Sequence, residues 1–165
     1  GLPIQEATQS SGFGYRISPI TGKLEFHKAL DLAAPRGTPI YAPASGTVIH
    51  SEYSQSLGYY IAIQHSNGFV TRYGHCSELI APKGAVIRQG EVIAKVGATG
   101  EATGNHLHFE MSKDGVVFDP AWLYDYDLVF PQRGKGAVYL LVFRGGDSDA
   151  SDRQNRAVAE TVHLS

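Results

Sequence analysis

The stretch YYIAIQHSNGFVTRY, residues 59–73, decides the fold class of this chain. It contains two runs of aromatic and β-branched residues, which favour strands. Between the runs lies the pair Asn67-Gly68, and both residue types readily accept the positive φ that tight hairpins need. We therefore predict a β-hairpin closed at this pair.

Similar short runs lie on both sides of the hairpin, separated by turns rich in glycine and proline. They include TPIYA, GTVIHSEY, EVIAKVG and HLHFEMS. Short strands separated by such turns predict an all-β fold, a compact antiparallel sheet or sandwich with little helix. Single helical turns are expected only at residues 76–80 and 120–124.

The character of the sequence changes toward its C-terminus, and we predict three parts. Residues 1–10 form a lead-in, residues 11–125 the main β domain, and residues 126–165 an extension. Within the extension, GAVYLLVF (136–143) predicts one more strand. A flexible polar tail follows, with a weak helix predicted over residues 152–162.

The composition excludes several classes of protein. The net charge is −2 in 165 residues, which gives no electrostatic argument for nucleic-acid binding. No apolar run is long enough to span a bilayer. The single cysteine, Cys76, excludes an internal disulfide and any zinc site built from cysteines alone.

The stretch GNHLHFEM (104–111) places His106 and His108 one residue apart. On a strand, alternate side chains share a face, so both imidazoles face one side while Leu107 and Phe109 face a core. Two histidines on one face favour a metal site over satisfied surface histidines.

A second candidate lies in FHKALDLAAPRG (26–37), which carries His27 and Asp31. Their spacing fits one face of either a helical turn or a strand, but Pro35 and Gly37 argue against a long helix, so we favour extended or loop structure. A histidine and a carboxylate are a normal pair of zinc ligands. Taken alone, the pair is more often a surface histidine beside an aspartate.

A third candidate, His75 in RYGHCS, stands at a predicted strand end and in isolation reads as a solvated histidine. Taken together, the three candidates favour a metal site. His27, Asp31 and either His106 or His108 would give three zinc ligands and leave a fourth position for water, as in catalytic sites.

The remaining histidines would then serve as general base and as donor to an oxyanion. A structural zinc would instead need Cys76 as its fourth ligand. The spacing alone leaves open which of His106 and His108 takes the metal.

The glycine-rich run that precedes the paired histidines has no phosphate-binding pattern, and its glycines are better explained by strands that approach closely. Residues 86–100 resemble half of a biotinyl or lipoyl carrier domain. Such a carrier needs its lysine at a hairpin tip, whereas Lys95 lies within a predicted strand.

Taken together, several motifs resemble the lysostaphin-like (LytM-type) zinc endopeptidases, which cut peptidoglycan peptides. They are SGFGYR (11–16), FHKALDLAAPRGTPIYAPASGTV (26–48), TRYGHCS (71–77), QGEVIAKVGATGEATGNHLHFEM (89–111) and DP (119–120). They follow the order and spacing of that family across residues 11–125.

The resemblance implies a compact antiparallel β architecture with a groove over one catalytic Zn²⁺. It implies that His27, Asp31 and His108 bind the zinc. His75 and His106 would then be catalytic, activating water or stabilising the tetrahedral intermediate, in an order that the sequence does not settle.

The implied function is zinc-dependent hydrolysis of peptide bonds in the stem peptides or cross-bridges of bacterial peptidoglycan. The alternative is a catalytically silent or autoinhibited LytM-type regulator of other cell-wall hydrolases. We expect a monomer acting in the periplasm or on the cell-wall side, with specificity set by loops 50–59 and 76–84.

Cys76 stands where relatives commonly have leucine, and we expect a small buried hydrophobic residue rather than a redox-sensitive one.

Overall fold

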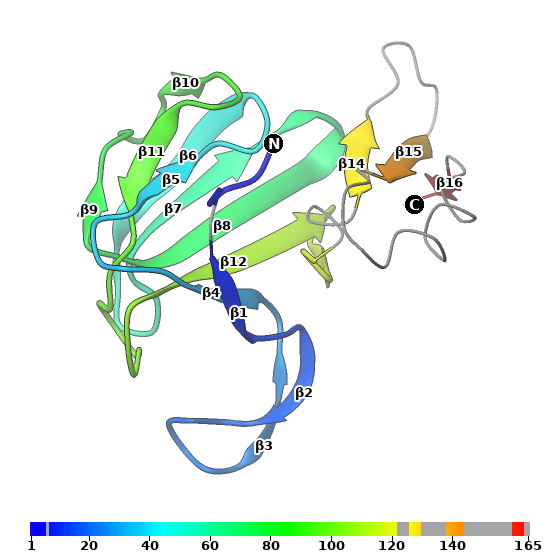
Figure 1. Cartoon of the computed structure of the whole chain (residues 1–165). Helices are drawn as coiled ribbons and strands as arrows, with labels where there is room; N and C mark the ends of the chain where they lie inside the picture. Colours follow the sequence, from blue (N-terminus) through cyan, green and yellow to red (C-terminus); the bar gives the residue numbers. More distant parts are fainter. Residues whose placement is uncertain (6, 122–125, 130–137, 144–159, 164–165) are drawn as a thin grey trace. The chain divides into compact units, whose positions relative to one another are not determined.

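The computed structural model describes residues 1–5, 7–121, 126–129, 138–143 and 160–163. The chain divides into two units, Gly1–Pro120 and Ala121–Ser165 (Figure 1). The described residues form β-strands with one short 3₁₀ turn, η1 (Ser66–Gly68), which confirms the all-β prediction. Among them, no helix has the length and apolar character needed to cross a membrane.

The first unit contains thirteen strands. They are β1 (Thr8–Ser11), β2 (Gly14–Ile17), β3 (Leu24–His27), β4 (Leu30–Ala33), β5 (Pro39–Tyr41), β6 (Gly46–Ser54), β7 (Gly58–Gln64), β8 (Phe69–Cys76), β9 (Glu78–Leu79), β10 (Val86–Ile87), β11 (Val92–Lys95), β12 (His106–Lys113) and β13 (Val116–Phe118).

The largest sheet has eight antiparallel strands in the order β1-β4-β12-β8-β7-β6-β10, with β13 paired to β12 beside this path. At its centre, β7 and β8 form the hairpin that the sequence predicts. Asn67 and Gly68 both have positive φ, 59° and 78°, as expected for the turn.

A second sheet, β5-β11-β9, lies against the β6–β7 part of the first (Figure 1). The core contains apolar side chains from both sheets. Ile61, Phe109 and Leu107 from the large sheet are fully buried, as are Ile40 and Ile93 from the small one. The other face of the large sheet is thereby left to polar side chains of β12 and β4.

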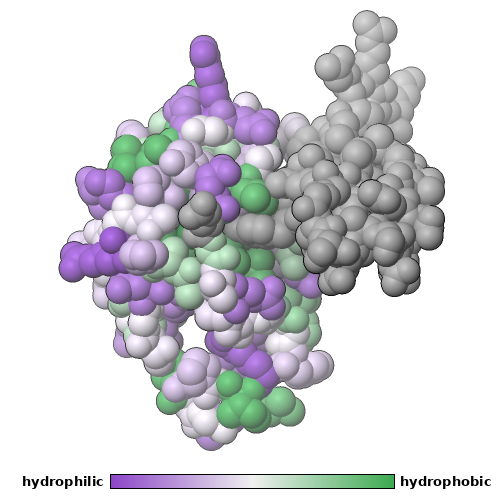
Figure 2. All heavy atoms as spheres, viewed as in Figure 1, coloured by the Kyte–Doolittle hydropathy of each residue, from purple (hydrophilic) through white to green (hydrophobic). Residues whose placement is uncertain are grey.

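Strands β2 and β3 form a separate two-stranded hairpin that projects from the rest of the unit (Figure 1). Its outer part exposes apolar side chains, including Tyr15, Ile17 and Leu24, and Figure 2 shows this hydrophobic cluster at the hairpin's end. The base of the hairpin ends at His27, the first of the candidate site residues.

The helical turn predicted at residues 76–80 is wrong. Glu78–Leu79 is strand β9, because its backbone pairs with β11, where Ala94 lies opposite Leu79. This long-range pairing overrides a weak local preference. The turn predicted at 120–124 lies mostly outside the described residues.

The second unit contains a three-stranded sheet of β14 (Tyr126–Val129), β15 (Val138–Phe143) and β16 (Glu160–His163). Strand β15 confirms the strand predicted over residues 136–143. The helix predicted over 152–162 is wrong at its end, where β16 pairs with β15 instead. Its remaining residues, and the polar tail, lie outside the described residues.

Candidate metal centre and active-site cleft

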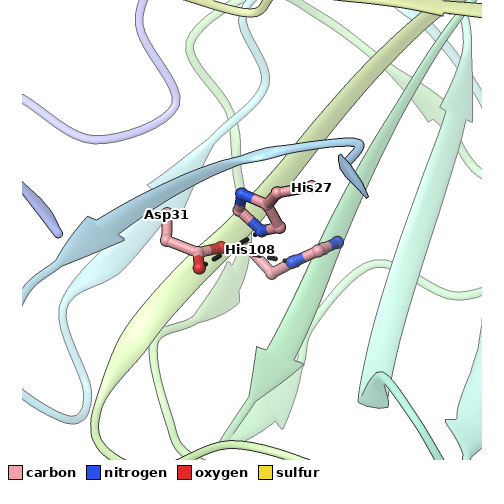
Figure 3. Close-up of side chains that lie close together, drawn as sticks. All are labelled: His27, Asp31 and His108. Carbon is pink, nitrogen blue, oxygen red and sulfur yellow. Dashed lines mark hydrogen bonds and ion pairs between the residues drawn. The ribbon is translucent and has the colours of Figure 1, made fainter. Parts of the chain in front are cut away.

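Three predicted ligands come together on the polar face of the large sheet. His27 is the last residue of β3, Asp31 lies in β4, and His108 lies in β12. Strands β4 and β12 are antiparallel neighbours, and their register places Asp31 directly opposite His108. Cross-strand partners share a face, so the two side chains meet, and His27 closes the group from the β3 end (Figure 3).

The ligand atoms of these residues converge. His27 Nε2 lies 3.3 Å from Asp31 Oδ2, and His108 Nδ1 lies 3.2 Å from Asp31 Oδ1. One ligand atom from each residue falls within 4.8 Å of the others. Two imidazole nitrogens and one carboxylate oxygen are a zinc-type donor set.

The ring of His27 is held in one tautomer. The Gly12 carbonyl can only accept, so Nδ1 must donate the 2.9 Å hydrogen bond between them. Nε2 then carries the lone pair. It is buried, and among the described residues it is the only buried side-chain nitrogen or oxygen without a hydrogen-bond partner. A cation would satisfy this orphaned acceptor, so the residues fit a metal.

His108 uses its other nitrogen. Its Nδ1 faces Asp31, and its Nε2 lies 3.6 Å from Glu110 Oε2. Burial lowers the pKa of His108, but the adjacent carboxylates of Asp31 and Glu110 outweigh this and raise the pKa to about 9. Without a metal, a proton therefore takes the place that a cation would hold.

Asp31 is buried yet ionised. Burial would raise its pKa, but the adjacent His108 and His27 hold the pKa well below its usual range. Arg16 from β2 also donates to Oδ2 at 3.2 Å, while its Nε donates to Glu25 at 2.9 Å. The carboxylate is thus fixed in orientation as well as in charge.

The two predicted catalytic histidines lie beside this group. The ring centroids of His75 and His106 are 4.8 Å apart, and those of His75 and His108 are 5.5 Å apart. His106 donates from Nδ1 to the Gly104 carbonyl at 2.9 Å, and its Nε2 lies 3.7 Å from Asp31 Oδ1. All five polar side chains expected from the sequence therefore meet in one place.

His75 is not the solvated residue that its position suggests in isolation, because its side chain is only 4 % exposed. Its Nδ1 donates to the Thr99 carbonyl at 2.7 Å, so its lone pair is on Nε2. Burial lowers the pKa of His75 to about 4, which keeps the ring neutral near pH 7.

A backbone distortion turns His75 toward the site. By strict alternation His75 would follow Thr71 and Tyr73 into the core. Instead it adopts a left-handed φ of 62°, and the β7–β8 register shifts between Tyr59 and Ile61. A left-handed non-glycine residue costs on the order of 1 kcal/mol and such strain clusters at functional sites.

Glycines allow the loop that holds His75 to approach closely. A Cβ on Gly100 would lie 2.3 Å from the Gly58 nitrogen, and one on Gly58 would lie 2.4 Å from Thr99. The bare backbones let Thr99 reach His75 with its carbonyl, while its hydroxyl donates to the Cys76 carbonyl at 2.6 Å. Close approach is what the glycine-rich run was predicted to provide.

A cleft of about 380 Å³ opens over these groups. Its lining comes from several segments: Ser10, Ser11, Arg16, Ser18, Pro19, Ile20, Thr21, Glu25, Asp31, Ser56, Leu57, His75, Glu101, Ala102, Thr103, His106 and His108. Loop 50–59 contributes as predicted. Loop 76–84 contributes no lining residue among those described, and residues 18–21 and 101–103 take that place.

Two residues weighed in alternative hypotheses lie elsewhere. Cys76 is fully buried, burial raises the pKa of its thiol to about 12, and it does not belong to the ligand group. Lys95 lies within β11 and pairs with Glu78 at 3.2 Å, rather than standing at a hairpin tip. The structural-zinc and carrier-domain hypotheses therefore lose their key residues.

Three contributors were missed by sequence reasoning: Arg16, Thr99 and Glu110. The sequence contained a recognisable signal for two of these residues. Arg16 ends the SGFGYR motif, and Glu110 follows His108 by two residues and so shares its face on a strand. Nothing local marks Thr99, which acts through a backbone carbonyl.

The chain is similar to known peptidases in sequence and in fold. The chain is 39% identical over 119 residues to the peptidoglycan DD-endopeptidase ShyC of Vibrio cholerae, covering 72% of this chain but only 28% of ShyC. A zinc-containing peptidase from Vibrio cholerae of known structure superposes with a TM-score of 0.67 at 36% identity, covering 72% of this chain and 37% of that one.

The catalytic domain of lysostaphin from Staphylococcus simulans superposes with a TM-score of 0.63 at 27% identity, covering 69% of this chain and 89% of that one. The sequence pattern of Peptidase family M23 matches residues 25–120, which include all five polar residues of the site. By this match and by its fold, the chain belongs to Peptidase family M23.

Proposed function

We propose that this chain is a zinc-dependent endopeptidase that hydrolyses peptide bonds in the stem peptides or cross-bridges of bacterial peptidoglycan. The observation that carries the proposal is the convergence of His27 Nε2, Asp31 and His108 Nδ1 within 4.8 Å, beneath a cleft lined by two further histidines.

Zinc is the metal that this donor set favours, and one ion would be held by His27, Asp31 and His108. When bound, zinc supplies Lewis acidity toward a water molecule and a substrate carbonyl. The three protein ligands leave room for both in the cleft, as catalytic rather than structural sites do.

We assign proton transfer to the two flanking histidines, His75 and His106. His75 offers a neutral Nε2 lone pair, because its Nδ1 proton is committed to Thr99, so it acts as the general base. His106 binds the Gly104 carbonyl through Nδ1 and turns its Nε2 toward the ligand group, 3.7 Å from Asp31 Oδ1. We assign His106 the remaining role, as donor from Nε2 to the developing oxyanion when its ring carries both protons.

The substrate assignment rests on relatives. ShyC is named a peptidoglycan DD-endopeptidase, and lysostaphin an antimicrobial peptidase. We therefore place this chain on the periplasmic or cell-wall side, acting as a monomer on wall peptides. The complete set of five polar residues supports an enzyme over a catalytically silent regulator.

The test is to incubate the purified chain with sacculi of different cross-bridge chemistry and to identify the released fragments by mass spectrometry. We expect release with zinc, loss after a chelator, and recovery when zinc is returned. Full release by metal-free protein would contradict the zinc mechanism. Zinc binding without release from any sacculus would contradict the enzyme and favour the regulator.

A further inference from the structure

The second ring nitrogen of His108 has an unusual partner. In His27, His75 and His106, the nitrogen that faces away from the metal group donates to a backbone carbonyl. In His108 it faces a carboxylate instead, with Nε2 at 3.6 Å from Glu110 Oε2. Among these four rings, His108 alone has a charged group behind it.

Glu110 is held firmly enough to serve as such a partner. It follows His108 by two residues on β12 and so shares its face, while Phe109 between them is fully buried in the core. Its side chain is only 17 % exposed, like that of His108. Across the sheet, the register pairs Glu110 with Arg72 of β8.

This arrangement has a chemical consequence for a metal ligand. A carboxylate that accepts the second N–H of a histidine fixes the ring's tautomer and orientation and makes the other nitrogen a stronger donor. We propose that Glu110 is a positioning residue that holds His108 Nε2–H and so directs Nδ1 at the zinc. The proposal rests on the zinc site of the proposed function.

The same chain offers a matched control. His50 and Glu52 are also two residues apart on one strand, β6, with Nδ1 and Oε1 at 2.8 Å. Both side chains are exposed, and neither lines the cleft. Replacing Glu52 removes a carboxylate from a histidine without touching the metal group.

The experiment measures zinc affinity by competition with a chromogenic chelator in wild type, Glu110→Gln, Glu110→Ala and Glu52→Gln. We expect the dissociation constant to rise about tenfold in Glu110→Gln, whose amide oxygen can still accept, and up to about 100-fold in Glu110→Ala. Glu52→Gln should match the wild type. Absorption bands of the cobalt-substituted proteins would report the changed ligand geometry, which a purely structural role would leave intact.

Circular dichroism of the metal-free variants checks folding, and if Glu110→Ala is unfolded, Glu110→Gln decides. Zinc affinity within twofold of wild type in a folded Glu110 variant would overturn the positioning role. That result is distinct from failure of the proposed function, in which wild type itself binds no zinc or releases nothing from sacculi.

Discussion

Two buried histidine clusters share the central sheet but differ in how completely they are satisfied. On the core face, His65 donates from Nδ1 to the Ser45 carbonyl at 2.8 Å. Its Nε2 accepts from the Thr71 hydroxyl at 2.7 Å, and that oxygen lies 2.6 Å from the Tyr73 hydroxyl. On the opposite face, the group around His27 leaves Nε2 without a hydrogen bond.

This difference distinguishes a structural cluster, around His65, from a functional one, around His27. The His65 chain is closed, because each donor meets an acceptor and nothing further is needed to offset burial. The His27 group is open: it gathers lone pairs and an anionic carboxylate toward one point, an arrangement that only a cation balances. Both clusters contain a buried histidine, His27 at 4 % and His65 at 8 % exposed, so the unpaired atom is the informative feature.

The largest effect should come from removing a ligand of the open group. His27→Ala, Asp31→Ala or His108→Ala should abolish stoichiometric zinc and lower fragment release from sacculi by at least about 10³-fold, because several kcal/mol of transition-state stabilisation are lost. Elemental analysis and mass spectrometry measure both. His50→Ala, at an exposed histidine, is the control. Wild-type activity in any ligand variant would refute the site.

Removing a flanking histidine should separate chemistry from metal binding. His75→Ala and His106→Ala should keep one equivalent of zinc and lose about 10²- to 10⁴-fold in rate, the usual contribution of general acid–base groups. Zinc content of purified protein and initial rates on one sacculus preparation decide this. If His106→Ala loses the metal and His108→Ala keeps it, the assignment of the pair is reversed.

Disrupting the His65 cluster should lower the stability of the protein rather than its zinc binding. Thr71→Val leaves His65 Nε2 and the fully buried Tyr73 hydroxyl without their partner, which should cost about 1–3 kcal/mol in the free energy of unfolding. Urea denaturation measures it, with zinc content expected to stay at the wild-type value. Thr47→Val, at an exposed site on β6, should change little. An unchanged unfolding midpoint in Thr71→Val would mean that the chain of hydrogen bonds contributes nothing.

The smallest effect should be a pH dependence of the same cluster. Burial lowers the pKa of His65 below that of the unfolded chain, so on acidification the unfolded state takes up the proton first. The contribution of His65 to stability is therefore complete above pH 6.5 and is lost as the pH falls toward the folded-state pKa. Unfolding curves of the metal-free protein at several pH values test this. His65→Gln should reduce the loss of stability below pH 6.5 and leave the part contributed by His75, whose pKa burial also lowers.

The hairpin and the paired histidines show how much could be predicted from sequence. Alternation along a strand predicted that Leu107 and Phe109 are buried while His106 and His108 share the other face, and both predictions are confirmed. The turn at Asn67-Gly68 was equally local. By contrast, residues 76–80 were predicted as helix, because the backbone partner that makes them a strand lies some fifteen residues away.

The sequence by itself determined the strands, the face on which each histidine of β12 lies, and the family resemblance with its five polar residues. Only the tertiary structure decided that His27 presents Nε2 and that His108 turns Nδ1 toward Asp31, since the Gly12 carbonyl and the Asp31 carboxylate come from segments distant in sequence from those two rings. It also turned His75 out of the core through a left-handed backbone. Strand periodicity is a property of neighbouring residues, whereas ring orientation depends on contacts between distant ones.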